Sequence, residues 1–247
     1  MKKNILITCA LPVEMKAVKK QIKGLGRTDV SFSFLTTGVG NMNTALSMQE
    51  YILTKEKPDF IINIGVCGKA SSDISDDLFQ VYRIFHAASQ RESICPVYVS
   101  LFNFKSLLCS DRIITDYNDM QDEVYVDMES QAIDTIATKY TIPYVILKQP
   151  FDTVSHESKK VSLNMLGAEL ENIDYSEIIH KVSAFLDKNH TITLDFEQYK
   201  QHFLFTVAEQ MIFIKKYHKM QATGGNFEKF FEKNKTLSKK VFLEEMS

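Results

Sequence analysis

The chain lacks the long apolar runs and the excess of one charge that define several large classes of protein. Its 247 residues contain no apolar run that approaches the roughly 20 residues of a membrane-spanning helix. The formal net charge is −2, so the overall balance favours neither nucleic acid nor a membrane as a partner. The short apolar run near Met1 ends at Leu11-Pro12, which indicates a first β-strand rather than a signal peptide.

Cysteine pairs are also missing. The four cysteines form no CxxC motif and have no metal-ligand spacing with histidine; they are Cys9, Cys67, Cys95 and Cys109. In a chain of this size they indicate free thiols in a reducing compartment, so we predict a cytoplasmic protein without a metal site. Cys67 lies in a glycine loop, where it is either a catalytic thiol or, as we favour, a small apolar packing residue.

Glycine is scarce, and its placement is informative. The chain has nine glycines, and four of them lie in two motifs, Gly38-x-Gly40 and Gly65-x-x-Gly68, each of which follows an apolar run. Neither motif is a dinucleotide fingerprint or a Walker loop, so neither predicts NAD or a nucleoside triphosphate. Both fit ordinary strand-to-helix turns, and both also fit a close approach of the backbone to a ligand.

Apolar runs alternate with stretches of helical periodicity over the first two thirds of the chain. With 45% hydrophobic residues, the chain can bury one full-sized core. The alternation predicts an α/β fold: a single domain with a central mixed, largely parallel sheet flanked by helices. The principal predicted strands are residues 5–9, 30–36, 60–64 and 144–147. Further strands are predicted at residues 78–88, 94–101, 108–115 and 123–126, and a helix at 128–140.

The last third of the sequence is helical in pattern. Asp174 and Glu177 resemble a capping box that opens a helix over residues 175–189. A long helix is predicted from about residue 196 to 221, ended by Gly224-Gly225, and a short aromatic helix follows. We therefore divide the chain into an α/β core, residues 1–165, and a helical C-terminal extension, residues 166–247, packed on the core.

Three acids stand at the ends of three apolar runs. Glu14 follows the first run, Glu129 follows Val126-Asp127-Met128, and Asp152 follows the last run. Glu14 shares a helical face with Val18 and Ile22, and an acid on a core-facing stripe needs a partner. Each acid alone also fits a purely structural role, either in the first turn at the positive end of a helix dipole or as a helix cap. Together, the three acids predict a site at the rim of the sheet.

These motifs resemble one family. The segments Ala10-Leu11-Pro12-Val13-Glu14, Thr37-Gly38-Val39-Gly40, Asn63-Ile64-Gly65-Val66-Cys67-Gly68, Val126-Asp127-Met128-Glu129-Ser130 and Phe151-Asp152 are similar to those of the nucleoside phosphorylase superfamily. The closest branch is that of the methylthioadenosine/adenosylhomocysteine nucleosidases. The resemblance covers residues 1 to about 155, and its most specific part is the Met-Glu pair followed by an Asp after the next strand.

The resemblance implies a role for each residue. Asp152 would be the general acid at N7 of a purine, and Glu129 would bind the ribose hydroxyls with Met128 packed on the sugar. Glu14 would orient and deprotonate the attacking water, because an activated water can attack the oxocarbenium-like sugar. The backbone of Ile114 would read the adenine edge. The implied partner is a small nucleoside, and no cofactor is implied.

This sequence departs from the family at several positions. Val66 stands where the family has Ser or Thr, Ile113 replaces an aromatic residue that stacks on the base, and Phe151 replaces a Ser before the catalytic acid. The segment from residue 76 to 109 is shorter than in the family. Phosphorylases of the superfamily carry arginines in the first glycine loop, whereas this chain carries Glu14 there, so the resemblance implies hydrolysis rather than phosphorolysis.

Three hypotheses remain open at this point. The first is a purine nucleosidase that hydrolyses the N-glycosidic bond of an adenosine-type nucleoside such as methylthioadenosine or adenosylhomocysteine. The second is a hydrolase of another nucleoside, such as futalosine or a modified purine nucleoside. The third is a catalytically impaired nucleoside-binding protein. The family also implies a homodimer, unless the extra helices cover that surface and leave a monomer.

Overall fold

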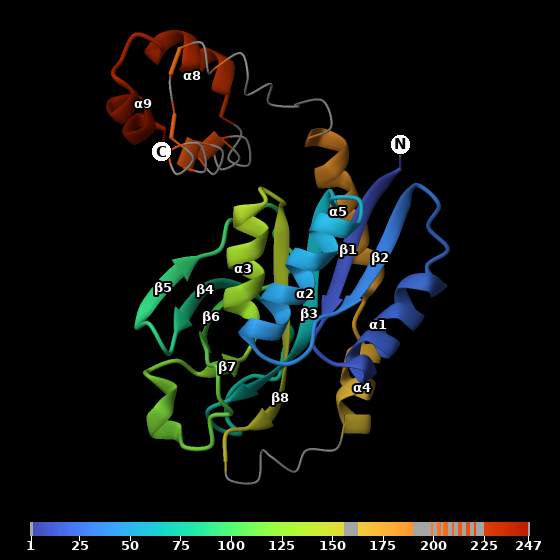
Figure 1. Ribbon diagram of the computed structural model, residues 1–247. Helices are drawn as coiled ribbons and strands as arrows, with labels where there is room; N and C mark the ends of the chain where they lie inside the picture. The colour runs from blue at the N-terminus through green and yellow to red at the C-terminus, as the bar shows by residue number, and fades with distance from the viewer. Residues whose placement is uncertain are drawn as a thin grey trace.

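The computed structural model describes residues 2–155, 163–189 and 225–246, together with scattered residues between 199 and 220. Strands and helices alternate through the first part of the chain (Figure 1). The strands are β1 (Lys3–Cys9), β2 (Val30–Thr36), β3 (Phe60–Lys69), β4 (Phe79–His86), β5 (Arg91–Ile94), β6 (Phe104–Cys109), β7 (Tyr125–Asp127) and β8 (Tyr144–Thr153). The helices of this part are α1 (Pro12–Gly24), α2 (Asn41–Thr54), η1 (Tyr117–Met120), α3 (Ser130–Lys139), α4 (Leu163–Glu171) and α5 (Tyr175–Asn189).

The strands form one mixed sheet, which confirms the predicted fold class. Its order is β2-β1-β3-β7-β6-β4-β5, and β8 pairs with both β3 and β4. Strands β1, β2, β3 and β8 run parallel, whereas β3 and β7, and β4 and β8, are antiparallel. Since β3, β8, β4, β6 and β7 each pair with the next and β7 returns to β3, these five strands close into a ring.

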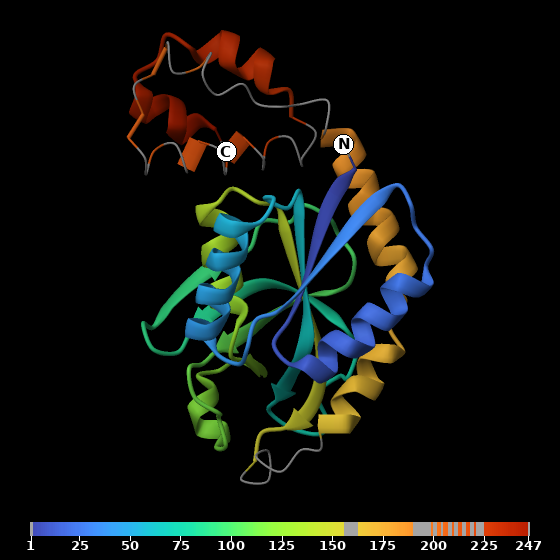
Figure 2. The ribbon, with the colours of Figure 1, turned by 45° about the vertical axis from the view of Figure 1, so that its right-hand side comes forward.

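Helices cover both faces of the sheet (Figure 2). Helices α1, α4 and α5 pack with β1, β3 and β8 into one core, and α2 and α3 pack on the opposite face. Alternation along β3 explains how one strand serves both cores, since Phe60 and Ile62 join the first while Ile61 joins the second. Each of these side chains is fully buried, which stabilises the fold by about 1.5–3 kcal/mol per residue.

Two of the predicted strands are wrong in extent. Residues 95–101 form no strand, because Gln80 replaces a strand partner there: its side chain donates to the Val99 carbonyl and accepts from Leu101 N–H. The strand predicted at 108–115 ends instead at Cys109. Ser110 closes a local turn immediately after it, with its hydroxyl donating to the Arg112 carbonyl and accepting from Arg112 N–H.

The C-terminal segment has a hydrophobic core of its own. Helices α8 (Phe227–Asn234) and α9 (Lys239–Glu245) contribute to it together with single aromatic residues from the preceding stretch, namely Tyr199, Phe203, Phe213 and Tyr217. Helices α4 and α5 belong to the core of the sheet instead. Most of the helix predicted over residues 196–221 lies outside the described residues, and the division of the chain at residue 165 stays a prediction. Among the described helices, none is long and apolar enough to cross a membrane.

Candidate active site

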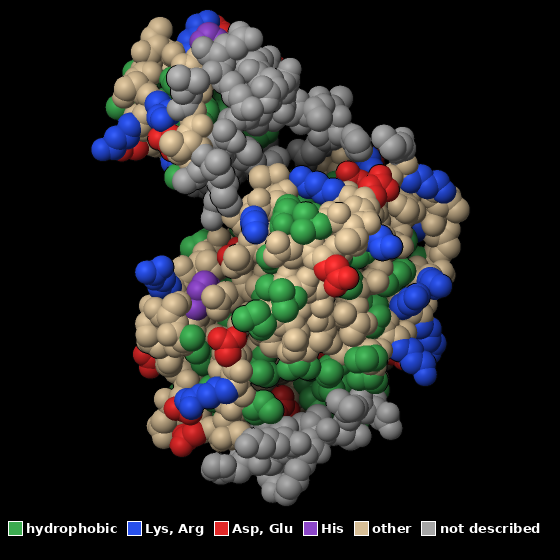
Figure 3. Space-filling model, in the orientation of Figure 1, with side chains coloured by type: hydrophobic (Ala, Val, Ile, Leu, Met, Phe, Trp, Pro, Cys, Tyr) green, Lys and Arg blue, Asp and Glu red, His purple; other side chains and the backbone are tan. Residues whose placement is uncertain are grey.

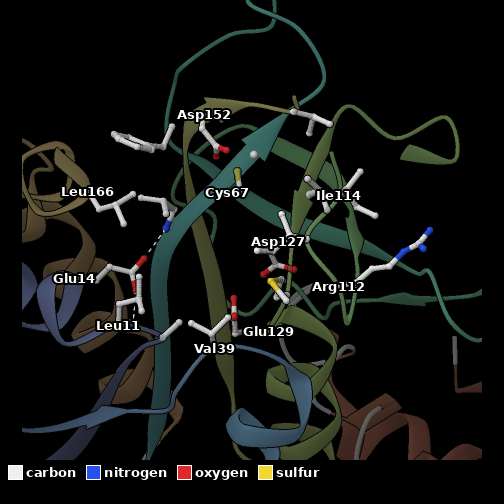
Figure 4. Close-up of a pocket in the computed structure, with 18 residues that line it drawn as sticks. Leu11, Glu14, Val39, Cys67, Arg112, Ile114, Asp127, Glu129, Asp152 and Leu166 are labelled. Atoms are coloured by element: carbon white, nitrogen blue, oxygen red, sulfur yellow. Dashed lines mark hydrogen bonds between the residues drawn. The ribbon is translucent and has the colours of Figure 1, made fainter. Parts of the chain in front are cut away.

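One cavity of about 360 Å³ opens at the end of the sheet where β1, β3 and β8 finish (Figure 4). Every site residue that the sequence singled out lines this cavity: Glu14, Val66, Ile113, Ile114, Met128, Glu129 and Asp152. They come from α1, β3, the loop after β6, the β7–α3 junction and β8. The fold thus gathers three acids that are far apart in the sequence around a single space.

Glu14 is a buried carboxylate in the first turn of α1, with 2% of its surface exposed. One oxygen accepts from Leu11 N–H at 2.8 Å, and the other accepts from Val66 N–H at 3.1 Å. Pro12, at the first helical position, has no backbone N–H that needs an acceptor, so the Glu14 carboxylate is available to Leu11 and Val66. Burial raises the pKa of Glu14 above its ordinary value, and the two backbone N–H groups oppose that rise only partly.

Glu129 occupies the position before α3 and is also buried. Its Oε1 accepts from the N–H of Gly40, the second glycine of the first motif, at 2.8 Å. Gly40 has φ of +93°, a conformation open to glycine, and this turn aims its amide at the acid. Burial raises the pKa of Glu129 to about 7; the charges of Asp127 and Glu14 add to the rise, whereas Lys148 and the Gly40 amide oppose it.

Asp152 reaches the cavity because of an irregularity in β8. The pairing of β3 with β8 shifts between Cys67 and Gly68, so that Pro150 lies opposite Cys67 and Asp152 lies opposite Gly68, with Phe151 as the extra residue. A bulge of this kind re-aims the side chains that follow it. Within the described part of the chain, no hydrogen bond or ion pair engages the Asp152 carboxylate, which leaves it available to a ligand.

The sequence reasoning missed a buried ion pair behind the cavity. Lys148 Nζ lies 2.7 Å from Asp127 Oδ2, and both side chains are at most 2% exposed. Asp127 also accepts from the N–H and the hydroxyl of Ser130, which fixes the start of α3 two residues later than predicted. Burial alone would lower the pKa of Lys148, but Asp127 and the two glutamates raise it above its ordinary value. A signal was present, because a charge inside a strand buried on both faces requires a partner.

Apolar side chains form much of the remaining wall. A Cβ on Gly68 would meet Val126, Asp152 and Val154, which places these three side chains together. Cys67 of β3 and Leu166 of α4 also line the cavity (Figure 4). Burial raises the pKa of the Cys67 thiol well above its ordinary value, so the thiol is neutral and suits a packing role.

The loop after β6 contributes two isoleucines with different surroundings. Ile114 is buried at 5% exposure, whereas Ile113 is 52% exposed. Among the described residues, no group of three His, Cys, Asp or Glu side chains has the arrangement to hold a metal ion.

Solved structures share this fold. No protein-family model matches the chain, and no curated protein sequence matches it. The structure is similar to 5′-methylthioadenosine/S-adenosylhomocysteine nucleosidase from Neisseria meningitidis, with a TM-score of 0.61 and 14% identity over 72% of this chain and 98% of that one.

Two further solved structures are similar to a comparable degree. A 5′-methylthioadenosine nucleosidase from Arabidopsis thaliana matches with a TM-score of 0.58 and 19% identity, over 74% of this chain and 96% of that one. A futalosine hydrolase from Helicobacter pylori matches with a TM-score of 0.60 and 11% identity, over 75% and 99%. The chain therefore shares its fold with these solved nucleosidases, which confirms the fold that the sequence predicted.

Proposed function

We propose that the protein is a nucleosidase that hydrolyses the N-glycosidic bond of a purine nucleoside. The observation that carries this proposal is the arrangement of Glu14, Glu129 and Asp152 around one cavity, with apolar walls between them. Asp152, which has no partner among the described residues, protonates N7 of the purine as the bond to the sugar breaks. Glu14 activates the water that attacks the oxocarbenium-like sugar, and the buried carboxylates stabilise its positive charge.

The other residues of the cavity position the substrate. Glu129 accepts hydrogen bonds from the ribose hydroxyls, and Met128 packs on the sugar. The Ile114 backbone meets the edge of the base, and Ile113 covers the base in place of an aromatic ring. Val66 offers no hydroxyl to the water, but its N–H fixes Glu14, so the orientation of the base catalyst survives that departure from the family.

The charges around the cavity favour water over phosphate as the nucleophile. Arg112 is the one cationic side chain among the described residues that line it. This guanidinium is 74% exposed and bound to Asp119 at 3.1 Å, so it is not directed at an anion in the cavity. Lys148 is neutralised by Asp127. A phosphate would therefore meet acids without a compensating cation, whereas water meets a base.

We infer an adenosine-type nucleoside, such as methylthioadenosine or adenosylhomocysteine, as the first candidate substrate. The likeness to futalosine hydrolase favours another nucleoside as the second candidate. The departures at Val66 and Phe151 favour a third reading, a nucleoside-binding protein with impaired turnover.

The test is incubation with adenosine, methylthioadenosine, adenosylhomocysteine, inosine and futalosine, with and without phosphate, scored for free base and free sugar. Phosphate-independent release of adenine supports the first candidate, and release of another base supports the second. Binding without release supports the third reading, and neither binding nor release contradicts the proposal.

We further propose that the protein acts as a homodimer in the cytoplasm. Met42, Leu46 and Leu53 form one stripe along α2 and are 60–73% exposed. Such an apolar stripe is unusual on the solvent-facing side of a helix. Apolar side chains are visible over this helix (Figure 3), and a groove between α2 and Met128 adjoins the cavity. Light scattering should give twice the chain mass, and Leu46→Glu should halve it. Val241→Glu in α9 is the matched control.

A further inference from the structure

Lys148 has a position that the proposed roles do not explain. It lies in the middle of β8, wholly buried, and it does not line the cavity, whereas its partner Asp127 does. Burying an ammonium costs desolvation free energy, and we therefore ask what the charge of Lys148 does for the groups around it. Because Lys148 does not line the cavity, any effect of its charge on the cavity passes through the side chains that separate the two.

Glu14 is one of those side chains. A Cβ placed on Gly65 would lie 3.3 Å from Glu14 Oε1 and 3.6 Å from Lys148 Nζ. The carboxylate and the ammonium therefore both lie over the face of Gly65 that a side chain would occupy, without forming a direct ion pair. An opposite charge at such short range favours the charged form of an acid. The lack of a side chain at Gly65 allows both groups to approach the strand.

The thiols and the phenol that face this cluster are neutral. Burial raises the pKa of three thiols and one phenol around it, namely Cys9 of β1, Cys67 of β3, Cys109 of β6 and Tyr175 of α5. Asp152 faces it from the cavity rim. Among the described residues, one ammonium thus faces three buried carboxylates, those of Glu14, Asp127 and Glu129. A buried cluster does not hold two unbalanced negative charges, so one acid carries a proton.

Hydrogen bonding decides which acid that is. Asp127 forms the direct ion pair with Lys148 and accepts from the N–H and the hydroxyl of Ser130. Among the described residues, Glu14 accepts from two backbone N–H groups, whereas Glu129 accepts from one and lies close to Asp127. We propose that Lys148, anchored by Asp127, is a positioning residue whose charge keeps Glu14 ionised and leaves the remaining proton of the cluster on Glu129. This proposal rests on the proposed function only for its catalytic consequence, namely a base ready to activate water.

The test compares two variants that remove opposite charges from the Lys148–Asp127 pair. The carboxyl carbons of ¹³C-labelled glutamates are titrated by NMR in the whole chain, with Glu14→Gln and Glu129→Gln to assign them. Lys148→Met should move the titration midpoints of both glutamates up by about one pH unit or more, and Asp127→Asn should move them down. Loss of a purely structural ion pair would not shift the midpoints in opposite directions, so shifts of the same sign, or none, would overturn the proposal.

A matched control is available on the neighbouring strand. Lys69 of β3 is also buried, at 5%, and is ion-paired with Asp76. Lys69→Met removes a buried lysine in the same way but should leave both midpoints at their parental values. Lys148→Arg retains the charge and should restore midpoints close to those of the parent.

Folding failure and failure of the proposed function remain distinguishable. If Lys148→Met does not fold, the same substitution is made in the Asp127→Asn background, where Asp127 is no longer left as a buried charge without its lysine. The midpoints of both glutamates should then rise relative to those of Asp127→Asn alone. The titration needs no substrate, so a protein that releases no base would refute the proposed function without deciding this proposal. If nucleosides are hydrolysed, the acidic limb of the kcat/KM profile should move with the glutamate midpoints.

Discussion

Among the described residues, none pairs with the Asp152 carboxylate, and this sets it apart from Glu14 and Glu129. Replacing it with Asn keeps the shape and removes the transferable proton. We expect Asp152→Asn to lower kcat by about 10²–10⁴-fold, the usual contribution of a general acid. The unfolding midpoint should stay within error of the parent, because no described interaction of the side chain is lost. Near-parental hydrolysis by this variant would show that the proton comes from another group.

Glu129 gives the fold a pH dependence of its own. Its pKa is about 7 in the folded protein and about 4.5 ordinarily, so between these values the folded state binds more protons than the unfolded state. The stabilising contribution is complete below pH 4.5 and is lost as the pH rises through about 7, an effect of up to about 3 kcal/mol.

We therefore predict that Glu129→Gln, which cannot ionise, is more stable than the parent at pH 8 but not at pH 4.5. Urea unfolding of both proteins at the two pH values checks this. An equal difference between parent and variant at both values would contradict it. The same variant should bind nucleosides more weakly, because an amide presents one acceptor oxygen to the ribose hydroxyls where a carboxyl group presents two.

At the scale of elements, strand β3 lets Glu14 and Lys148 approach each other, because Gly65 has no side chain. Gly65→Ala would place a methyl group 3.3 Å from Glu14 Oε1, closer than ordinary contact, so the carboxylate must shift. We expect a loss in kcat of at least about tenfold with a small change in KM, since the base moves and the ribose contacts do not.

Gly24→Ala is the matched control for this change. A Cβ on Gly24 meets nothing within 4 Å, and the residue lies at the end of α1. This variant should retain full activity and gain up to about 1 kcal/mol in helix stability. If Gly24→Ala and Gly65→Ala behaved alike, the effect could not be assigned to the Glu14 contact.

The same elements show what the sequence could predict. The apolar runs placed β1, β2, β3 and β8, and the acids that follow them point to the rim because parallel strands end at the same edge. The sequence could not reveal that Gln80 satisfies the backbone of residues 99–101, because a side chain acting as a strand partner leaves no periodic signal. Nor could it reveal the pairing of Lys148 with Asp127, which depends on how β7 and β8 meet across β3.

At the scale of the molecule, the described helices that follow β8 contribute to two separate groups of buried residues. The core on the α1 side includes residues of α4 and α5 up to Leu186, and the C-terminal cluster contains only residues from Tyr199 onward. We predict that a chain ended after residue 189 keeps the far-UV circular dichroism of a folded α/β protein and keeps any nucleoside affinity of the parent. Loss of both would show that the C-terminal segment is required for the sheet core.

Strand β3 makes backbone hydrogen bonds to β1, β7 and β8, and its last residues border the cavity. A single inserted or deleted residue there would turn every following side chain to the opposite face and break three registers at once. Descendants of this chain can therefore change length in surface connections such as the one between Gly24 and Val30, but not within this strand. Its ten residues therefore set a length and a register that changes elsewhere in the chain have to preserve.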